Sequence, residues 1–562
     1  MGGGEALAKF LLAQKSKLTI TDLRKRKILE PVIKRLGNNK IEFVLGKHRE
    51  ADFKKNDIIV FNPAVSIFSR WAKLAKRYKK PIENDLTLFL KILKTKNPNA
   101  DYIAVTGTRG KTTTSFWINH FLEKSVLGGN IPGKGFFTIL ENKEWPFVLE
   151  LSSFELEFLK RSAKPPKVAV IMNLYNDHLN RYGNFNKYLE QKAKIFLNQT
   201  KNDYLILNAD NEYTKEFLEK KPKPKIYYLS LKKLPANKSG LYFIGNKIYF
   251  NNDSQKKLVH EIKNLASHQK YNLLAALLGA HLYGKPWKEL IKKIKSLPQP
   301  SFRQELVFKG KNLEIINDSA STSPDATIAA LERFGGKDEL TLITGGADKC
   351  LDFSGLAKKI KTCVKPENLL LLEGNATLKL INELNKNNYC KPKDIRIFNS
   401  LNAILTGVAK ESHWGTVIFS PAAASFEKFK NEFDRGRQFN KIINRVFNQE
   451  HGKIKRSPLE NAYLKIHEKE SEGLEDWEIA KQIVEVLDDP NWIDPDLAKE
   501  CLYSIVHEIS YPDEETKKSV ILMAEEKARN VFPELSEIDE VHMDQIEYAY
   551  NKWRQEKQAQ NK

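Results

Sequence analysis

The segment Val105–Phe116, VTGTRGKTTTSF, constrains the fold of this 562-residue chain more than any other. An apolar run at 102–107 leads directly into the glycine-rich residues 107–112, and a helical pattern begins near Lys111. Glycines allow a tight turn in which several backbone N–H groups converge on a phosphate. The lysine can then meet the β- and γ-phosphates, and the Thr112 hydroxyl can ligate Mg²⁺. The segment therefore predicts a phosphate-binding loop between a strand and a helix.

Two polar clusters follow other apolar runs that are expected to be strands. Glu150 lies in the run 147–151, within LELSSFELE, and Asp177 and His178 follow the run 167–173. Because parallel sheets hold ligands at the carboxyl ends of their strands, we expect both clusters beside the phosphate loop. A carboxylate there suits Mg²⁺, and a histidine can ligate a metal or place a substrate. The alternatives are an edge glutamate that faces solvent and a histidine with a structural role.

Lys192 lies in the helical pattern that follows His178. Carbamylation by CO₂ would give its side chain an oxygen ligand for Mg²⁺, whereas an ammonium group repels the ion. For an arbitrary lysine the simpler interpretation is a solvated side chain. A metal-binding role for Lys192 is therefore a hypothesis that depends on its neighbours.

Short apolar runs alternate with helical patterns over most of the chain, which predicts an α/β fold with mostly parallel sheets. We expect an α/β domain at 1–97, a phosphate-loop domain at 98–300, a third α/β domain at 301–449 and an acidic helical region at 450–562. The first domain is expected to contain strands at 18–24 and 57–63. The proline-containing segment LPQPSFRQE, residues 297–305, predicts a hinge or linker.

The chain opens on three glycines, residues 2–4, that run directly into an amphipathic helical pattern. A glycine turn of this kind normally follows a strand in a nucleotide-binding unit. We therefore expect that the natural start lies upstream or that the first strand is missing.

Charge is divided unevenly along the chain. Residues 451–562 contain 15 Lys and Arg against 26 Asp and Glu, whereas residues 1–450 contain 77 against 44, a net charge of +33. A basic body favours polyanionic partners such as nucleotide and phosphate substrates. The alternative interpretation is a lysine-rich solvated surface, because the lysines are spread rather than clustered.

Two absences narrow the class of protein. No apolar run approaches the roughly 18 residues of a transmembrane helix. Cys350, Cys363, Cys390 and Cys501 are widely scattered, a spacing that suits neither a zinc site nor a disulfide scaffold. This cysteine usage indicates a reducing, cytoplasmic location.

Over residues 1–449 the chain resembles the Mur ligase family, the ATP-dependent enzymes that form peptide bonds in peptidoglycan synthesis. Eight segments occur in family order: GTRGKTTT, ELSSFELE, NDHLNRYG with the Lys192 helix, SHQKYNLLAAL, FRQE, NDSASTSPDAT, GGADKCLDF and SPAAASFEKFKNEFDRG. The resemblance implies a Rossmann-like N-terminal domain, a central P-loop ATPase domain and a Rossmann-like C-terminal domain. It also implies a cytoplasmic monomer.

The resemblance assigns site residues by position in these motifs. Its implied ATP-binding residues are Gly107, Thr108, Arg109, Gly110, Lys111, Thr112, Thr113, Asn272, Arg303 and Asp318. Its implied metal ligands are Thr112, Glu150, His178 and carbamylated Lys192, and its implied catalytic residues are Lys111, His178 and Lys192. Its implied substrate-binding residues are Asp22, Arg24 and Asn130 for the nucleotide-linked substrate, Thr322, Lys349 and Ser425 for the amino acid, and Ser152.

Within the family, ELSSFELE and SPAAASFEKFKNEFDRG favour the branch that adds D-glutamate to UDP-N-acetylmuramoyl-L-alanine. The implied reaction uses ATP and two Mg²⁺ ions: the substrate carboxylate becomes an acyl phosphate, which the D-glutamate amine attacks. No nucleic-acid or membrane partner is expected, although the acidic region could bind a protein. The alternatives are a folylpolyglutamate-type or other amino-acid ligase, and a degenerate Mur-like scaffold with an acidic interaction tail.

The chain departs from the family pattern at four positions, which bear on the identity of the added amino acid. Gln269 replaces an asparagine near the adenine contact, and Ala320 replaces a lysine. Asn180 replaces an aspartate, and Glu432 occupies a position where an aromatic residue often flanks the amino-acid pocket, beside Phe433.

Overall fold

The computed structural model describes residues 3–447, apart from short gaps, and a few residues between 513 and 523. The gaps are 38–39, 141, 143–144, 176, 253–254, 263–264, 337–338, 350, 391–393, 411–414 and 426–427. The chain divides into two compact units, Met1–Ile442 and Ile443–Lys562. Almost all of the helical region predicted at 450–562 lies outside the described residues, and the first unit holds the site discussed below.

The N-terminal part of the first unit contains two small parallel sheets. Strand β1 (Leu18–Asp22) pairs with β2 (Ile41–Leu45), and β3 (Ile59–Val60) pairs with β4 (Ile82–Glu83). The surrounding helices are α1 (Gly3–Ala13), α2 (Arg26–Leu36), α3 (Glu50–Lys55), α4 (Arg70–Arg77) and α5 (Asp85–Lys96). The strand expected at 18–24 is present, whereas the one expected at 57–63 is reduced to two residues.

The shortening of β3 has a local cause. The Asn62 side chain accepts a hydrogen bond from the Ala64 backbone N–H (2.9 Å), which turns the chain after Phe61. Pro63 lies within this turn and has no N–H to donate to a neighbouring strand.

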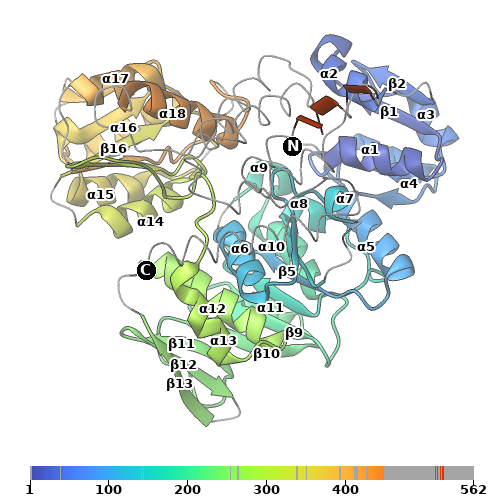
Figure 1. The fold of residues 1–562 in the computed structure, drawn as a ribbon, viewed down its shortest axis with the longest axis horizontal. Helices are drawn as coiled ribbons and strands as arrows, with labels where there is room; N and C mark the ends of the chain where they lie inside the picture. The colour runs from blue at the N-terminus through green and yellow to red at the C-terminus, as the bar shows by residue number, and fades with distance from the viewer. Residues whose placement is uncertain are drawn as a thin grey trace. The chain divides into compact units, whose positions relative to one another are not determined.

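A nine-stranded sheet forms the centre of the first unit (Figure 1). Its order is β13-β12-β11-β10-β9-β8-β5-β7-β6, parallel from β6 to β11 and antiparallel at the β11–β13 end. The strands are β5 (Tyr102–Thr106), β6 (Val126–Gly129), β7 (Phe147–Glu150), β8 (Val168–Ile171), β9 (Tyr204–Asn208), β10 (Lys225–Ser230), β11 (Gly240–Ile244), β12 (Lys247–Asn252) and β13 (Gln255–Glu261).

Both faces of the sheet are covered at β5, β7 and β8, so these strands are buried and apolar. Along β5, Ile103 and Val105 contribute to one core cluster, whereas Tyr102 and Ala104 contribute to the other. The first cluster includes α6 (Lys111–Leu122), α12 (Ser267–Leu282) and α13 (Trp287–Lys293), and the second includes α5, α7 (Phe136–Ile139) and α10 (Phe185–Ala193). The short helices α8 (Ser153–Leu156), α9 (Leu179–Tyr182) and α11 (Thr214–Glu219) lie in the connections between strands.

The C-terminal part of the first unit is built on a six-stranded sheet, in the order β14-β15-β19-β16-β17-β18. Only β14, at its edge, is antiparallel to its neighbour. The strands are β14 (Glu305–Lys309), β15 (Leu313–Asn317), β16 (Leu340–Gly345), β17 (Leu369–Leu372), β18 (Arg396–Phe398) and β19 (Gly415–Phe419), and the helices are α14 (Pro324–Phe334), α15 (Ser354–Cys363), α16 (Asn375–Lys386) and α17 (Leu401–Lys410). The last helix, α18 (Glu432–Phe447), begins in this unit and includes its last residue, Ile442. The α/β architecture predicted from the sequence is confirmed.

Among the described residues, no helix is long and apolar enough to cross a membrane.

The central core gives a direct test of this arrangement. Leu274 in α12 is fully buried, whereas Leu258 on β13 is 51% exposed. We expect Leu274→Ala to lower the free energy of unfolding by about 2–5 kcal/mol, because it leaves a cavity in a close-packed core. Leu258→Ala, the matched control, should cost less than about 1 kcal/mol. Urea denaturation of the two variants measures both values, and equal losses would contradict the packing described for α12.

Candidate active site

The site is organised by three neighbouring strands whose carboxyl ends coincide. Strand β5 lies between β7 and β8, with Val105 opposite Glu150 and Thr106 opposite Ile171. The chain that leaves each of these strands therefore emerges at the same edge of the sheet. The phosphate loop follows β5, Glu150 ends β7, and Asp177 and His178 come after β8, as the sequence predicted.

The loop after β5 requires glycine at two positions. Gly107 and Gly110 have positive φ angles of 149° and 81°, and a Cβ atom on Gly110 would lie 2.5 Å from the Asn272 side chain. The loop is braced by Asn173, whose backbone carbonyl accepts from the Thr108 N–H (3.0 Å) and whose side-chain oxygen accepts from the Arg109 N–H (2.9 Å). The predicted strand–turn–helix unit is therefore present.

Lys111 is the first residue of α6 and folds back over this loop. Its Nζ donates to the backbone carbonyls of Gly107 (3.1 Å) and Thr108 (3.2 Å). Burial lowers the pKa of Lys111, and the charges of Arg109 and Arg303 add to that lowering. An anion placed in the loop would offset this crowding of positive charge.

Glu150 is buried among hydrogen-bond donors. Its carboxylate accepts from the Thr112 hydroxyl (2.7 Å) and from the Asn130 side-chain amide (3.2 Å), and the residue is only 2% exposed. Within the part of the chain that the structure describes, no lysine, arginine or histidine forms an ion pair with it. Buried carboxylates are normally paired or bound to a metal, so Glu150 and Thr112 fit a hard cation such as Mg²⁺.

No group of three or more His, Cys, Asp or Glu side chains lies at metal-binding spacing among the described residues. A Mg²⁺ ion at Glu150 would therefore take much of its coordination from water and phosphate oxygens, which is usual for this ion.

Lys192, on α10, is one of the most deeply buried polar residues, with 2% exposure. Its Nζ donates to the Thr106 hydroxyl (3.0 Å) and the Gly107 carbonyl (3.0 Å), and it lies 5.6 Å from the centre of the Tyr188 ring. Burial, together with the nearby charge of Lys111, lowers the pKa of Lys192 well below its usual value. This environment favours the neutral amine.

The Tyr188 ring also packs against His178. The centroids of these two rings are 6.0 Å apart, and the His178 ring also packs 4.7 Å from that of Phe154. Burial lowers the pKa of His178 to about 4, so the imidazole is neutral at pH 7 and able to ligate a metal. Beside it, Asp177 forms an ion pair with Arg109 (3.2 Å).

Asn272 joins α12 to the phosphate loop. It is buried beside Gly110, and its side-chain oxygen accepts from the Thr114 hydroxyl at 3.4 Å. Three residues earlier, Gln269 caps the start of α12 by accepting from the Ala266 N–H (3.2 Å). The departure from the family pattern at Gln269 therefore has a structural role that its sequence position did not reveal.

Arg303 and Asp318 lie where the C-terminal sheet begins. Phe302 and Gln304, on either side of Arg303, have left-handed backbones with φ of 61° and 54°. Asp318 holds this turn, because its carboxylate accepts from the Gln304 N–H (3.1 Å) and from the Ser420 hydroxyl (2.7 Å). The predicted hinge at 297–305 is thus an ordered turn at its C-terminal end.

The residues expected to bind the amino acid lie on loops that one buried arginine ties together. Arg435, on α18, donates to the backbone carbonyls of Ala423 (3.1 Å), Ala424 (3.2 Å) and Ser319 (2.8 Å). Ser425 follows Ala424, and its buried hydroxyl has no hydrogen-bond partner among the described residues. Sequence analysis missed Arg435, although it lies inside the motif SPAAASFEKFKNEFDRG.

Thr322 and Lys349 lie on the loops that follow β15 and β16, two strands separated by β19 in the same sheet. Thr322 is half-buried and Lys349 is exposed. Ala347 and Ala424 exchange backbone hydrogen bonds (2.9 and 3.2 Å), which brings the Lys349 loop beside the Ser425 loop. The Asn180 side chain, another departure from the family pattern, lies outside the described residues.

The remaining predicted residues have mainly local contacts. The Arg24 guanidinium pairs with Asp22 (2.7 Å) at the end of β1. Ser152 caps α8, since its hydroxyl accepts from the Glu155 N–H (3.2 Å) while Glu155 accepts from the Ser152 N–H (2.6 Å). Thr113 is half-buried in the first turn of α6.

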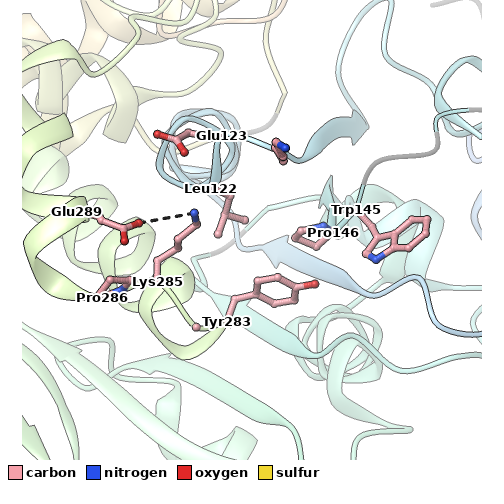
Figure 2. Close-up of a pocket in the computed structure, with 10 residues that line it drawn as sticks. Leu122, Glu123, Trp145, Pro146, Tyr283, Lys285, Pro286 and Glu289 are labelled. Atoms are coloured by element: carbon pink, nitrogen blue, oxygen red, sulfur yellow. Dashed lines mark ion pairs between the residues drawn. The ribbon is translucent and has the colours of Figure 1, made fainter.

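A cavity of about 500 Å³ lies at the opposite end of the central sheet (Figure 2). Lys124, Trp145 and Pro146, which precede β6 and β7, line it together with Tyr283 and an ion pair between Lys285 and Glu289 (3.7 Å). None of the predicted site residues lines this cavity.

The Asp318 carboxyl makes stability depend on pH. Burial raises its pKa from 3.8 to about 7, so the folded chain keeps a proton that the unfolded chain loses above pH 4. The resulting contribution to stability is largest below pH 4 and is lost as the pH rises to about 7. We expect the free energy of unfolding of wild type, relative to Asp318→Asn, to fall over this window by at most about 1.4 kcal/mol per pH unit. Urea denaturation of both proteins between pH 4.5 and 8 measures the difference, and parallel pH profiles would contradict it.

Comparison with known proteins supports the same family as the motifs. Residues 105–280 match the family model of the Mur ligase middle domain. The chain is 38% identical to the UDP-N-acetylmuramoylalanine--D-glutamate ligase of Borreliella afzelii, over 79% of this chain and 95% of that protein. It is 32% identical to the enzyme of the same name from Roseiflexus, over 79% of this chain and 96% of the relative.

The solved structures agree at the level of the fold. The crystal structure of UDP-N-acetylmuramate-alanine ligase MurC from Thermotoga maritima matches with a TM-score of 0.50 and 21% identity, covering 78% of this chain and 96% of that one. With its phosphate loop, its buried Glu150 and Lys192 and its relatives at more than 30% identity, the chain belongs to the Mur ligase family.

Proposed function

We propose that this chain is an ATP-dependent ligase that joins D-glutamate to UDP-N-acetylmuramoyl-L-alanine in peptidoglycan precursor synthesis. The observation that carries the proposal is the buried Glu150–Thr112 pair beside the phosphate loop, in a chain 38% identical to a UDP-N-acetylmuramoylalanine--D-glutamate ligase. This combination favours phosphoryl transfer from ATP to a carboxylate as the first step of amide formation.

The reaction divides into two steps. A carboxylate oxygen of the L-alanine end attacks the γ-phosphorus of ATP, the bond to the β-phosphate oxygen breaks, and ADP leaves. The D-glutamate nitrogen then attacks the acyl carbon, phosphate leaves with its electron pair, and the nitrogen loses a proton. Activation is necessary because a free carboxylate does not react with an amine at a useful rate.

The phosphate loop supplies positive charge and fixed donors to this reaction. Lys111 projects over residues 107–110, where it can hold the γ-phosphate during transfer, and Arg109 lies beside it. Such groups catalyse by positioning and electrostatic stabilisation, because the transferring phosphoryl group spreads negative charge over its oxygens. Asn272 would contact the adenine base, and Arg303 and Asp318 would reach the phosphates and ribose.

Thr112 and Glu150 would hold one Mg²⁺ ion, and His178 and carbamylated Lys192 a second. When bound, Mg²⁺ neutralises charge on the phosphate oxygens and orients them. The protein's part is to keep a buried carboxylate without a cationic partner at Glu150 and a neutral imidazole at His178.

We also propose that Lys192 reacts with CO₂. The neutral amine attacks the carbon of CO₂, a proton is released, and the side chain becomes an anionic carbamate. Two features support this step: the burial of Lys192, which favours the neutral amine, and the hydrogen bonds of its Nζ to the Thr106 hydroxyl and the Gly107 carbonyl, neither of which is a carboxylate. A carbamate would also replace the repulsion between Lys192 and Lys111 with attraction.

Other residues would hold the two carbon substrates. Asp22 and Arg24 would contact the uridine nucleotide, and Asn130 and Ser152 the muramoyl group. Thr322, Lys349 and Ser425 would bind D-glutamate, with Lys349 pairing to a carboxylate. We further propose a cytoplasmic location, which suits the free thiols of Cys363 and Cys390.

Amino-acid dependence tests the proposed activity. With ATP, Mg²⁺ and UDP-N-acetylmuramoyl-L-alanine present throughout, D-glutamate, L-glutamate and other amino acids are added one at a time. We expect phosphate release only with D-glutamate, because the family branch and the substrate loops favour it. Lys111→Ala should reduce the rate by roughly 10³-fold or more while the melting temperature stays near wild type.

Phosphate release that requires a different amino acid would contradict the substrate assignment. No release with any amino acid would favour the scaffold alternative, and full turnover by Lys111→Ala would overturn the role of the phosphate loop.

Chemical rescue tests the carbamate. Lys192→Ala should lower turnover by roughly 100-fold or more, because it removes an anionic ligand from the site. A small carboxylic acid such as acetate should restore part of that activity by entering the space left by the side chain. Steady-state rates at increasing acetate concentration provide the measurement, with Lys192→Arg as the control that leaves no space. Absence of rescue at every concentration would argue for a different role of Lys192.

A further inference from the structure

Two residues of the sequence motifs take no part in the reaction proposed above, yet they form a buried ion pair. Glu157 ends the motif ELSSFELE, and Arg181 lies in NDHLNRYG. The Arg181 guanidinium contacts the Glu157 carboxylate with two nitrogens, at 2.6 and 2.9 Å. The Glu157 side chain is fully buried and that of Arg181 is 10% exposed. Both residues belong to the central part of the first unit.

The ion pair also forms hydrogen bonds with backbone groups in the N-terminal part of the same unit. Arg181 donates to the backbone carbonyls of Pro63 (2.8 Å) and Ala64 (2.9 Å). Glu157 accepts from the backbone N–H of Ile67 (3.1 Å). The turn after β3, residues 62–67, is therefore held by three hydrogen bonds from the ion pair.

Apolar packing also joins the β7–β8 connection to the N-terminal part of the unit. Phe158, next to Glu157, packs with its ring centroid 6.0 Å from that of Phe61. It forms one buried cluster with Phe53, Ala72 and Ala75 of the N-terminal part. A side chain from the β7–β8 connection thus completes the core of the region that precedes β5.

The ion pair is also linked to the candidate metal site. The Arg181 guanidinium lies 4.0 Å from the centre of the Phe154 ring, which packs 4.7 Å from the His178 ring. The backbone N–H of Arg181 donates to the His178 carbonyl (3.0 Å). A movement of the 62–67 turn would therefore shift Arg181 and with it the His178 ring. A displacement of His178 would in the same way move the turn.

A buried pair of this kind is sensitive to geometry. Removing either partner leaves an uncompensated charge in the interior, and a lysine cannot reproduce the planar fork of arginine. Simple packing between two domains would not require a fully buried carboxylate with donors from both sides. The arrangement is better suited to fixing the 62–67 turn in one position relative to the central part of the unit.

We propose that Arg181 and Glu157 form a latch that fixes the 62–67 turn to the segment after His178 and so positions the nucleotide-linked substrate for reaction. The proposal rests on the proposed function, in which the N-terminal part binds that substrate. Arg181 and Glu157 are positioning residues, since they act through the 62–67 turn and contact no reacting atom.

Kinetics of Arg181→Lys and Glu157→Gln test the latch. We expect each variant to raise the KM for UDP-N-acetylmuramoyl-L-alanine by about 10-fold or more, because small displacements of bound substrate are costly. The KM values for ATP and D-glutamate should stay within about twofold of wild type. Arg161→Lys, at an exposed arginine of the same region, is the matched control and should leave all three values unchanged.

Hydrogen exchange provides a second readout that requires no turnover. The Ile67 amide should exchange faster in both variants, whereas amides of β5 and β8 should keep their wild-type protection. Unchanged KM values would overturn the latch. A rise in all three KM values together with loss of protection throughout the core would also overturn it. Absence of D-glutamate-dependent turnover in the wild-type chain would contradict the proposed function alone, because the exchange experiment still tests the latch.

Discussion

The site depends on the register of β5 with its two parallel neighbours. Val105 lies opposite Glu150 on β7, and Thr106 lies opposite Ile171 on β8. A shift of one residue on either side would turn alternate side chains to the other face of the sheet. The buried core on both faces prevents such a shift, so the phosphate loop, the Glu150 carboxylate and the His178 segment are held at one edge.

The same edge concentrates charges that the protein alone does not balance. Lys192 is buried and Lys111 is half-buried, the pKa values of both are lowered, and each donates to the Gly107 carbonyl. Glu150 is buried without a cationic partner among the described residues. Burial of unpaired charges is unfavourable, so the arrangement is best understood as preorganised for a ligand that carries both phosphate and a divalent cation.

Much of this site could be predicted from local sequence. A strand, a glycine turn and a lysine at the start of a helix specify a phosphate loop through nearby residues, and the apolar runs before Glu150 and Asp177 indicate strands that end there. The positions of Asn272 and Lys192 beside the loop depended on the family resemblance, because they come from distant helices.

Other features depend on side-chain contacts that the pattern of strands and helices did not indicate. The strand expected at 57–63 shortened because the Asn62 side chain turns the chain before Pro63. Gln269 caps a helix by accepting from the Ala266 N–H three residues earlier, and Arg435 ties loops more than 100 residues apart. The Arg181–Glu157 pair likewise forms hydrogen bonds with Pro63, Ala64 and Ile67, which are far away in sequence.

The central claim is that this edge of the sheet activates a carboxylate by phosphorylation. The most direct test uses UDP-N-acetylmuramoyl-L-alanine labelled with ¹⁸O in its carboxylate, together with ATP, Mg²⁺ and D-glutamate. The proposed mechanism predicts that the released phosphate carries one labelled oxygen atom from the substrate, because the acyl C–O bond breaks when the amine attacks. Release of unlabelled phosphate would show that water, rather than the carboxylate, receives the phosphoryl group, and would contradict the mechanism.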